Sequence, residues 1–539
     1  MRESGPPRID SPDVVVIGSG AGGGVIAKEL GEAGLTVVVL EAGKRYRPYD
    51  DYPTHLVDFE ARAEDVFAAQ DWRRDQYTSA ATPPFLYSRV KGLGGSTLAY
   101  HAMSPRLHES DFRTKTEDGV GDDWPISYAD LEPYYTRVEY ELGVSGPDGD
   151  AANPFEPPRS RPFPTPPHPF NLVSQAIKRG ADKLGLHLVR EPLAIPTRDW
   201  NGRPACINAG TCRLGCKISA KSSIDVTYIP SAERTGRVEF RTECMAREIT
   251  VRPDGRVRSV IYFAPDGHEE EISARVIVAA GNAIETPRLL LLSKSSLFPD
   301  GLANSSGLVG KRLIEHLSLF AHGFSSERVD SWRGVPTGGI IQDYYATQSA
   351  TGYARGYTIG VEMEPQWPFA TARDIPGWGA EHKARVKQAF AHLLGLATDG
   401  EQLPNERNRV LLDPSVKDSY GLPVPLIELR CYRNDLAMID AVEVKLKEIL
   451  SAAGATDIRV RQFRPGASSH YLGTCRMGTD PSTSVVDLWC RAHDIPNLFL
   501  GDGSVFVTGG AVNPALSISA VALRTAEAII AAFRRGDFP

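Results

Sequence analysis

One segment near the start of the chain constrains the fold more than any other. From Asp13 to Gly43 the sequence reads as an apolar run, a glycine cluster, a helical pattern and a second apolar run. This order is typical of a strand, turn, helix and strand in an α/β fold. Gly18, Gly20 and Gly23 have the spacing GxGxxG, in which missing side chains permit a tight turn and close approach to a pyrophosphate.

An acidic residue completes this motif. Glu41 closes the second apolar run, at the distance where a carboxylate accepts hydrogen bonds from a ribose. The segment therefore predicts a dinucleotide site. These residues alone leave open whether the dinucleotide is FAD or NAD.

Composition restricts the partners and the location. The chain has 539 residues, a length that predicts roughly two to four domains. Its formal net charge of -7 argues against a nucleic acid or an anionic membrane as partner and favours a small molecule. We find no apolar run of about 18 residues and no hydrophobic core in "MRESGPPRID", so we expect a cytoplasmic protein without direct membrane insertion.

The middle of the chain alternates between strand-like and irregular blocks. The stretch from Pro154 to Pro169 holds eight prolines, which exclude a helix or a central strand and indicate a connector or a lid. Residues 237–281 predict short strands with a "PDG" turn, followed by a helix around Pro287. The segment "DLAMIDAVEVKLKEILSAAG" has an amphipathic helical pattern.

Two irregular, glycine-bearing loops stand near the C-terminus. One is "HYLGTCRMG", which begins at His470 and fits neither a helical nor a strand period. The other precedes a helix that we expect to start with Asn513 as the cap and Pro514 behind it. Two such loops suggest one site.

Taken together, several motifs resemble the glucose-methanol-choline (GMC) family of FAD-dependent oxidoreductases. The segments are the N-terminal motif above, "GLGGSTLAYHAMSPR", "AAGNAIETPRLLLLS", "GLVGKRLIEHL", "HYLGTCRMG" and "GDGSVFVTGGAVNPALSISAVALR". The branch most similar contains bacterial sugar and gluconate dehydrogenases and pyranose oxidases. The resemblance implies a Rossmann-like FAD-binding domain, discontinuous in sequence, and an α+β substrate-binding domain with an antiparallel sheet.

The resemblance also implies domain limits. We expect the FAD-binding domain to comprise residues 12–155, 236–319 and 464–535. Residues 156–235 would form a connector or lid segment with a cysteine cluster, and residues 320–463 the substrate-binding domain.

Site residues follow from the same matching. His470 would take the proton from a substrate hydroxyl while the hydride passes to flavin N5, a task that suits an imidazole with an ordinary pKa of about 6.5. Asn513 would donate a hydrogen bond to the developing alkoxide. The positions expected to bind FAD are Gly18, Gly20, Gly23, Glu41, Gly94, Gly95, Ser96, Ala280, Asp502, Gly503 and Pro514.

Some relatives attach FAD covalently through a histidine in the loop after the paired glycines. Aligning this loop places Ala99 at that position, and His101 lies two residues out of register. We therefore expect non-covalent FAD.

Three of the seven cysteines cluster as Cys206, Cys212 and Cys216. The odd total argues against a disulfide framework, and a zinc site lacks an obvious fourth ligand. Some GMC sugar dehydrogenases hold a three-iron (3Fe-4S) cluster through three cysteines at similar spacing, but the proline-rich tail of those relatives is replaced here by "KISAKSS". Two interpretations remain open, a cluster or thiols that pack a loop, and the second is favoured.

The expected activity is oxidation of a secondary or anomeric hydroxyl of a sugar, glycoside or polyol. The electron acceptor would be oxygen, a quinone or an electron-transfer protein. Alternatives are oxidation of a sterol or other apolar alcohol, a nicotinamide-dependent reductase, and a non-catalytic flavoprotein subunit of an electron-transfer complex.

Overall fold

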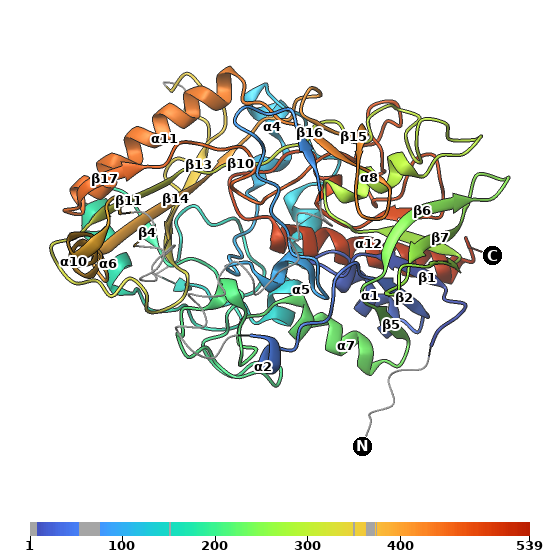
Figure 1. Cartoon of the computed structure of the whole chain (residues 1–539), viewed down its shortest axis with the longest axis horizontal. Helices are drawn as coiled ribbons and strands as arrows, with labels where there is room; N and C mark the ends of the chain where they lie inside the picture. Colours follow the sequence, from blue (N-terminus) through green and yellow to red (C-terminus); the bar gives the residue numbers. More distant parts are fainter. Residues whose placement is uncertain are drawn as a thin grey trace.

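The computed structural model describes residues 8–52, 76–149, 152–348, 351–362, 372 and 375–538. Parts of two predicted domains, including residues 53–75 and 363–371, lie outside these described residues. Two large sheets dominate the fold, and they lie at opposite ends of the long axis in Figure 1. The predicted α/β class, a parallel FAD-type sheet plus an antiparallel sheet, is confirmed.

The first sheet is parallel throughout, in the order β18-β9-β1-β2-β5. Its central strands read "VVVI", "VVVL" and "VIVA" and are fully buried, as expected where helices cover both faces of a sheet. The strands are β1 (Val14–Ile17), β2 (Val37–Leu40), β5 (Val238–Arg241), β9 (Val276–Ala279) and β18 (Leu498–Leu500).

Helices pack around this sheet, α1 against both α7 and α12, and α12 against α5. They are α1 (Gly23–Glu32), α5 (Tyr128–Leu142), α7 (Tyr228–Arg234) and α12 (Ala515–Arg535), with the shorter α2 (Pro48–Asp51) and α4 (Thr114–Asp118) nearby in sequence. Among the described helices, α12 is long and apolar enough to cross a membrane, but 67% of its most apolar window is buried within the protein. It is therefore a core helix of this fold.

The second sheet is antiparallel, in the order β17-β11-β14-β13-β12-β4, with β10 paired to β14. Its strands are β4 (Leu188–Val189), β10 (His316–Leu317), β11 (Phe320–Phe324), β12 (Thr337–Ile341), β13 (Tyr357–Glu362), β14 (Leu393–Glu401) and β17 (Thr456–Val460). Its apolar core includes residues from α6 (Leu172–Lys183) and α11 (Arg433–Ala452). The structure thus places α6 and β4, from the predicted connector, with the second sheet.

Two small sheets complete the fold. Residues 237–281 form the strands predicted for them, with the "PDG" turn between β6 (Met245–Val251) and β7 (Val257–Phe263), and α8 (Glu285–Leu292) follows. The remaining elements are β8 (Glu269–Ser273), α10 (Gly379–Ala389) and a sheet of β15 (Arg409–Lys417), β16 (Pro423–Glu428) and β3 (Thr78–Ser79). The β3·β16 pair joins segments more than 300 residues apart in the sequence.

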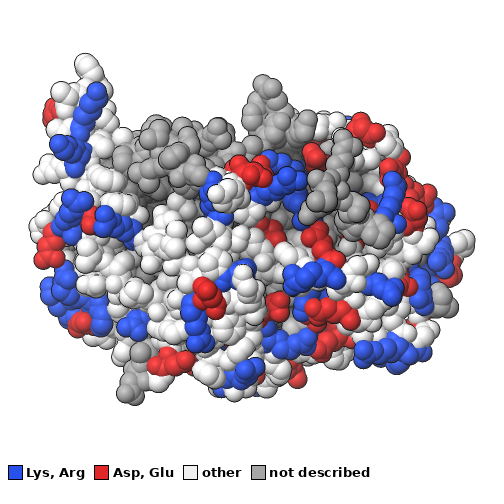
Figure 2. Space-filling view, turned by 90° about the horizontal axis from the view of Figure 1, so that it is seen from below, with Lys and Arg blue, Asp and Glu red and all other residues white. Residues whose placement is uncertain are grey.

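Acidic and basic side chains are intermixed over the described surface visible in Figure 2. Nothing on that face resembles the continuous basic surface that a nucleic-acid backbone requires. The arrangement agrees with the net charge of -7 and with a small-molecule ligand.

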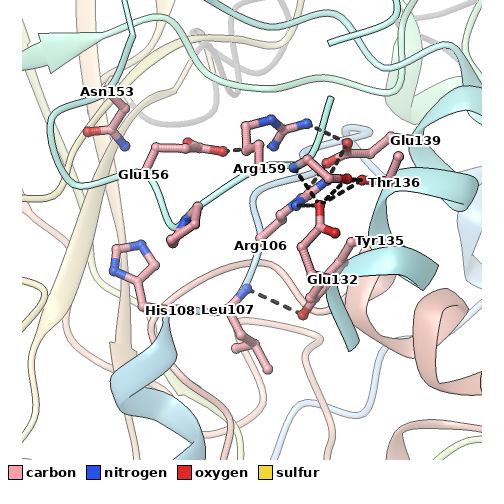
Figure 3. Close-up of polar contacts among 12 residues, drawn as sticks. Arg106, Leu107, His108, Glu132, Tyr135, Thr136, Glu139, Asn153, Glu156 and Arg159 are labelled. Atoms are coloured by element: carbon pink, nitrogen blue, oxygen red, sulfur yellow. Dashed lines mark hydrogen bonds and ion pairs between the residues drawn. The ribbon is translucent and has the colours of Figure 1, made fainter. Parts of the chain in front are cut away.

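A buried arginine fastens the loop after the paired glycines to α5 (Figure 3). Arg106 uses all five of its N–H donors: it binds Glu139 through two bonds of 2.8 Å, and Glu132, Tyr128 and Thr136 at 3.0 Å each. The proline-rich segment joins this network through Arg159, which pairs with Glu139 and with Glu156. This segment is therefore clamped to the core and forms no helix in the residues the structure describes.

We predict that replacing Arg106 with methionine strongly destabilises the fold. Glu139, whose exposed fraction is 0%, would lose its bidentate partner, and breaking a buried pair costs about 3 kcal/mol of the free energy of unfolding. Urea unfolding would measure the loss. The control Arg113→Met removes a 60% exposed arginine and should change the free energy by less than about 0.5 kcal/mol. Equal unfolding midpoints for the two variants would refute this role of Arg106.

Candidate active site

A cavity of about 480 Å³ lies between the two large sheets. One wall is made of loops at the carboxyl ends of β1, β2, β9 and β18, where ligands bind in open parallel sheets. The opposite wall is the inner face of the antiparallel sheet. Its lining residues are Ser318, Phe320, Ile340, Thr358, Gly360, Glu362, Ala397, Thr398 and Asp399.

The glycines of the first turn let three backbone segments meet. A Cβ atom at Gly18 would collide with the carbonyl oxygen of Ala280, and one at Gly22 with that of Gly501. Gly23 lies just behind the cavity, where a Cβ atom would collide with the carbonyl oxygen of Gly18. The turn therefore packs β1, α1, β9 and β18 together and presents bare backbone to the cavity.

Glu41 joins this turn to a second glycine loop. Its carboxylate accepts hydrogen bonds from Ser19 Oγ at 2.6 Å and from Gly43 N at 2.9 Å, while Gly94 N donates to Ser19 Oγ at 3.0 Å. Burial raises the pKa of Glu41. The hydrogen bonds lower it by a smaller amount, so the net pKa is raised. Glu41 lines the cavity, where the predicted ribose contact would be made.

The other predicted FAD positions gather at the same cavity. Asp502 accepts hydrogen bonds from Asn282 N at 2.8 Å, Thr286 Oγ1 at 2.5 Å and Ser504 N at 2.8 Å, which fixes the loop after β18. Predicted residues that line the cavity are Gly18, Gly20, Glu41, Gly95, Ser96, Ala280, Asp502, Gly503 and Pro514. Gly23 and Gly94 are outside the lining but contact residues of it, Gly23 at Gly18 and Gly94 at Ser19.

These features fit the dinucleotide predicted from the sequence. The cavity extends continuously from Glu41 to His470, and its lining includes the N-terminal ends of α1 and α12. Helix N-termini carry free N–H groups and a positive dipole end, which favour phosphate or another anionic group. A ligand with its ribose at Glu41 would have its other end near His470.

At that end the structure brings His470 and Asn513 together. Nε2 of His470 lies 3.2 Å from Nδ2 of Asn513, and Nδ1 of His470 lies 2.9 Å from Nδ1 of His316. Asp399 is also close, with Oδ1 3.5 Å from Nδ1 of His470. His470 and Asn513 both line the cavity, so the two residues predicted to be catalytic share one site with the FAD positions.

The hydrogen bonds of this group define one arrangement of protons. An amide nitrogen only donates, so Nε2 of His470 accepts from Asn513 and the proton of a neutral His470 is on Nδ1. This proton is donated to Nδ1 of His316, whose own proton on Nε2 faces the carbonyl oxygen of Gly509 at 3.4 Å. Burial lowers the pKa of His316 to about 4, which keeps it neutral and able to accept.

Asp399 adds a negative charge beside the two imidazoles. Burial raises the pKa of this carboxyl, but a protonated His470 beside it and the hydrogen bond from Ser318 outweigh burial, so that the net pKa is lowered. One ligand atom each from His316, Asp399 and His470 lies within 4.8 Å of the others, a donor set that could also hold a metal ion. The shared proton between the two Nδ1 atoms accounts for their short separation without an ion.

Sequence reasoning missed His316 and Asp399. His316 lies in "GLVGKRLIEHL", a motif that we quoted for the resemblance without giving its histidine a role. Asp399 lies in β14, within a region that carries no recognisable motif. Both are brought to His470 by the antiparallel sheet, since β10 pairs with β14.

One expectation about Asn513 was wrong. We expected it to cap the last helix, but α12 begins at Ala515, its N-cap position is Pro514, and no side chain makes a cap hydrogen bond. The amide of Asn513 is turned to His470 instead. The structure therefore uses Asn513 as a partner of His470.

The loop after the paired glycines carries no histidine in the register of the covalent relatives. Ala99 and His101 both line the cavity. Nδ1 of His101 lies 3.7 Å from Oε1 of Glu362 at the end of β13, so the imidazole is close to the antiparallel sheet.

The clustered cysteines lie beside the cavity loops. Burial raises the pKa of the Cys212 thiol to about 12, and it also raises the pKa of Cys206. Lys221 connects the cysteine region to the loop after the paired glycines, since its ammonium donates to the carbonyl oxygens of Leu98 and Cys212 at 2.7 Å each. Burial lowers the pKa of Lys221 to about 8.

Comparisons with known proteins agree with this geometry. Two models described as GMC oxidoreductase match the chain, one over residues 76–318 and one over residues 404–522. The chain is 34% identical to 2-methyl-1,2-propanediol dehydrogenase of Mycolicibacterium austroafricanum, over 96% of this chain and 95% of the relative. It is 30% identical to the fructose dehydrogenase large subunit of Gluconobacter japonicus, over 98% and 99% of the two chains.

A third relative is paromamine 6'-oxidase of Streptomyces fradiae, 32% identical over 96% of this chain and 91% of the relative. Among solved structures, pyridoxine 4-oxidase from Mesorbium loti has the same fold, with a TM-score of 0.65 and 19% identity over 96% of this chain and 98% of that chain. The resemblance inferred from the motifs is thereby confirmed. The chain belongs to the GMC oxidoreductase family and is an FAD-dependent oxidoreductase that acts on CH–OH donors.

Proposed function

We propose that the protein oxidises a secondary or anomeric hydroxyl of a sugar, glycoside or polyol, with His470 as the base that removes the hydroxyl proton. The observation that carries the proposal is the pair formed by Nε2 of His470 and the amide of Asn513, 3.2 Å apart in the cavity that also contains the predicted FAD positions. The proton-accepting atom faces the side on which a cofactor and a substrate would meet.

FAD would be held without a covalent bond by the glycine loops, by Glu41 and by the loop of Asp502. When bound, FAD supplies the two-electron acceptor for the hydride of the carbinol carbon. The positive end of α12, at Pro514, would stabilise negative charge on the ligand near it.

The remaining steps belong to this chain's own residues. A substrate hydroxyl would replace the direct hydrogen bond between His470 and Asn513, donate its proton to Nε2 and accept a hydrogen bond from the amide. Asn513 thereby stabilises the developing alkoxide, and His470 acts as general base. Nδ1 of His470 keeps its proton because neutral His316 accepts it, and Asp399 stabilises the imidazolium that forms.

A polar substrate is supported by the wall facing the glycine loops. Glu191, Glu362 and Asp399 all line the cavity, and carboxyl groups are poor neighbours for a sterol or another apolar alcohol. The names of the relatives point the same way, with a diol, fructose and paromamine as their substrates. The electron acceptor, whether oxygen, a quinone or an electron-transfer protein, and the cytoplasmic location stay predictions.

The proposal is tested by the visible spectrum of the purified protein, recorded anaerobically before and after sugars and polyols are added. We expect flavin bands that at least one of these alcohols bleaches. Bleaching by apolar alcohols alone would contradict the sugar assignment, and bleaching by no alcohol would favour an electron-transfer subunit. Broad absorption beneath the flavin bands would show an iron-sulfur cluster at Cys206, Cys212 and Cys216, against the packing role that we favour.

We predict that His470→Ala retains FAD but lowers kcat roughly 10²- to 10⁴-fold, since the general base is lost. Steady-state turnover of the alcohol that bleaches the wild type would measure the effect. His187→Ala is the control, because this histidine is 57% exposed and lies away from the cavity lining. Unchanged turnover of His470→Ala would exclude His470 as the base.

We predict that acid precipitation of the wild-type protein releases all of its flavin into the supernatant. The reason is that Ala99, in the register of covalent relatives, offers no nucleophile, and His101 lies beside Glu362. The absorbance of supernatant and pellet measures the partition. A yellow pellet that becomes colourless in a His101→Ala variant would instead assign a covalent bond to His101.

A further inference from the structure

Three carboxyl groups converge on the wall of the cavity that faces the glycine loops. Glu191 follows β4, Glu362 ends β13 and Asp399 lies in β14, so three different strands of the antiparallel sheet present them. These residues play different parts. Asp399 accompanies His470, whereas Glu191 has no part in the proton chain described above.

Glu191 is the least satisfied of the three. It is 5% exposed, and its Oε2 atom makes no hydrogen bond within the part of the chain that the structure describes. Burial raises the pKa of Glu191 to about 8, although the side-chain hydroxyl of Thr337 acts to lower it, and the charged groups that raise it further are Asp399 and Glu362. A buried polar atom without a partner costs free energy, so a ligand that supplies one is favoured.

Among the described lining residues, arginine and lysine lie outside the antiparallel sheet, where they are mixed with the acidic Glu41, Glu285 and Asp502. The cations Arg89 and Arg288 line the cavity together with Glu285, with which both form ion pairs at 3.1 Å. The carboxyl groups that face this site from the antiparallel sheet line the opposite wall, where Nδ1 of His101 lies 3.7 Å from Oε1 of Glu362. The substrate wall is therefore the acidic side of the cavity.

A protonated amine would bind at this carboxyl-bearing wall more favourably than a hydroxyl. A hydroxyl would give Glu191 one neutral hydrogen bond and would add no positive charge beside Asp399 and Glu362. An ammonium group offers three donors, forms charge-assisted hydrogen bonds and offsets the acidic potential of the wall. Opposite charges across an interface also discriminate against neutral competitors.

We propose that Glu191 is a specificity-determining residue that receives a protonated amino group of the substrate, so that the preferred substrates are amino alcohols such as amino sugars. This inference rests on the proposed oxidation of an alcohol at His470. It adds a second point of recognition on the opposite wall, which would orient the hydroxyl toward Nε2.

The test compares matched alcohols that differ only in one amino group, D-glucosamine against D-glucose and 1-amino-2-propanol against 1,2-propanediol. The quantity measured is the ratio of kcat/KM for the amino member to that for the neutral member, on FAD-loaded enzyme. We expect a ratio of at least ten for the wild type in one pair. In Glu191→Gln, which keeps the shape of the side chain and removes the carboxyl group that an ammonium would cause to ionise, we expect this ratio to fall at least tenfold.

Glu327→Gln serves as the control, since this glutamate is 70% exposed and lies outside the cavity lining, and the ratio should stay unchanged. If Glu191→Gln fails to fold, the test instead compares inhibition of the wild-type enzyme by propylamine and by propanol. We expect propylamine to inhibit at concentrations at least tenfold lower than propanol. A wild-type ratio near one, an unchanged ratio in Glu191→Gln, or equal inhibition by the two compounds would overturn the inference. These results leave the proposed function intact as long as neutral alcohols still bleach the flavin, whereas failure of every alcohol to bleach it would overturn both.

Discussion

The close approach of backbone segments at the carboxyl ends of β1, β9 and β18 is the constraint on which the site depends. Glycine at positions 18, 22 and 23 removes the Cβ atoms that would collide with neighbouring carbonyl oxygens. Because these segments meet, the loops of Ala280 and Asp502 reach the same cavity as the first turn. The antiparallel sheet then closes the opposite side of the cavity.

The reacting end is held by a chain of hydrogen bonds that joins α12, a loop and the antiparallel sheet. Asn513 belongs to the start of α12, His470 to a loop, and His316 to β10 of the antiparallel sheet. Each member restricts the proton position of the next, so that Nε2 of His470 carries no proton and accepts from Asn513, or from a substrate hydroxyl that replaces this hydrogen bond. Burial of His316 is essential here, since a protonated His316 would no longer accept.

Local patterns predicted the parts of this site that are local. The strand, turn and helix around Gly18 and the terminal Glu41 could be read from periodicity, and the motifs around His470 and Asn513 from their resemblance to a family. Asp399 could not be predicted, because its position depends on strand register across the antiparallel sheet, which sequence spacing does not reveal. The cap assigned to Asn513 was wrong because the rule considers only the helix backbone, whereas here the side chain has a tertiary partner.

The segment from Tyr77 to Lys91 runs from β3 to the cavity lining and is attached to the loop that carries His470. Its start pairs with β16, and the hydroxyl of Tyr471 accepts from Ser88 N at 2.9 Å and donates to Leu86 O at 2.8 Å. Residues 88–91 line the cavity. Tyr471, next to the proposed base, thus attaches this segment to the loop of His470, so a displacement of residues 86–88 would break hydrogen bonds to that loop. An FAD bound against residues 88–91 would leave past this segment only when the loop opens locally, and its residence time would then depend on this opening in addition to the contacts FAD itself makes.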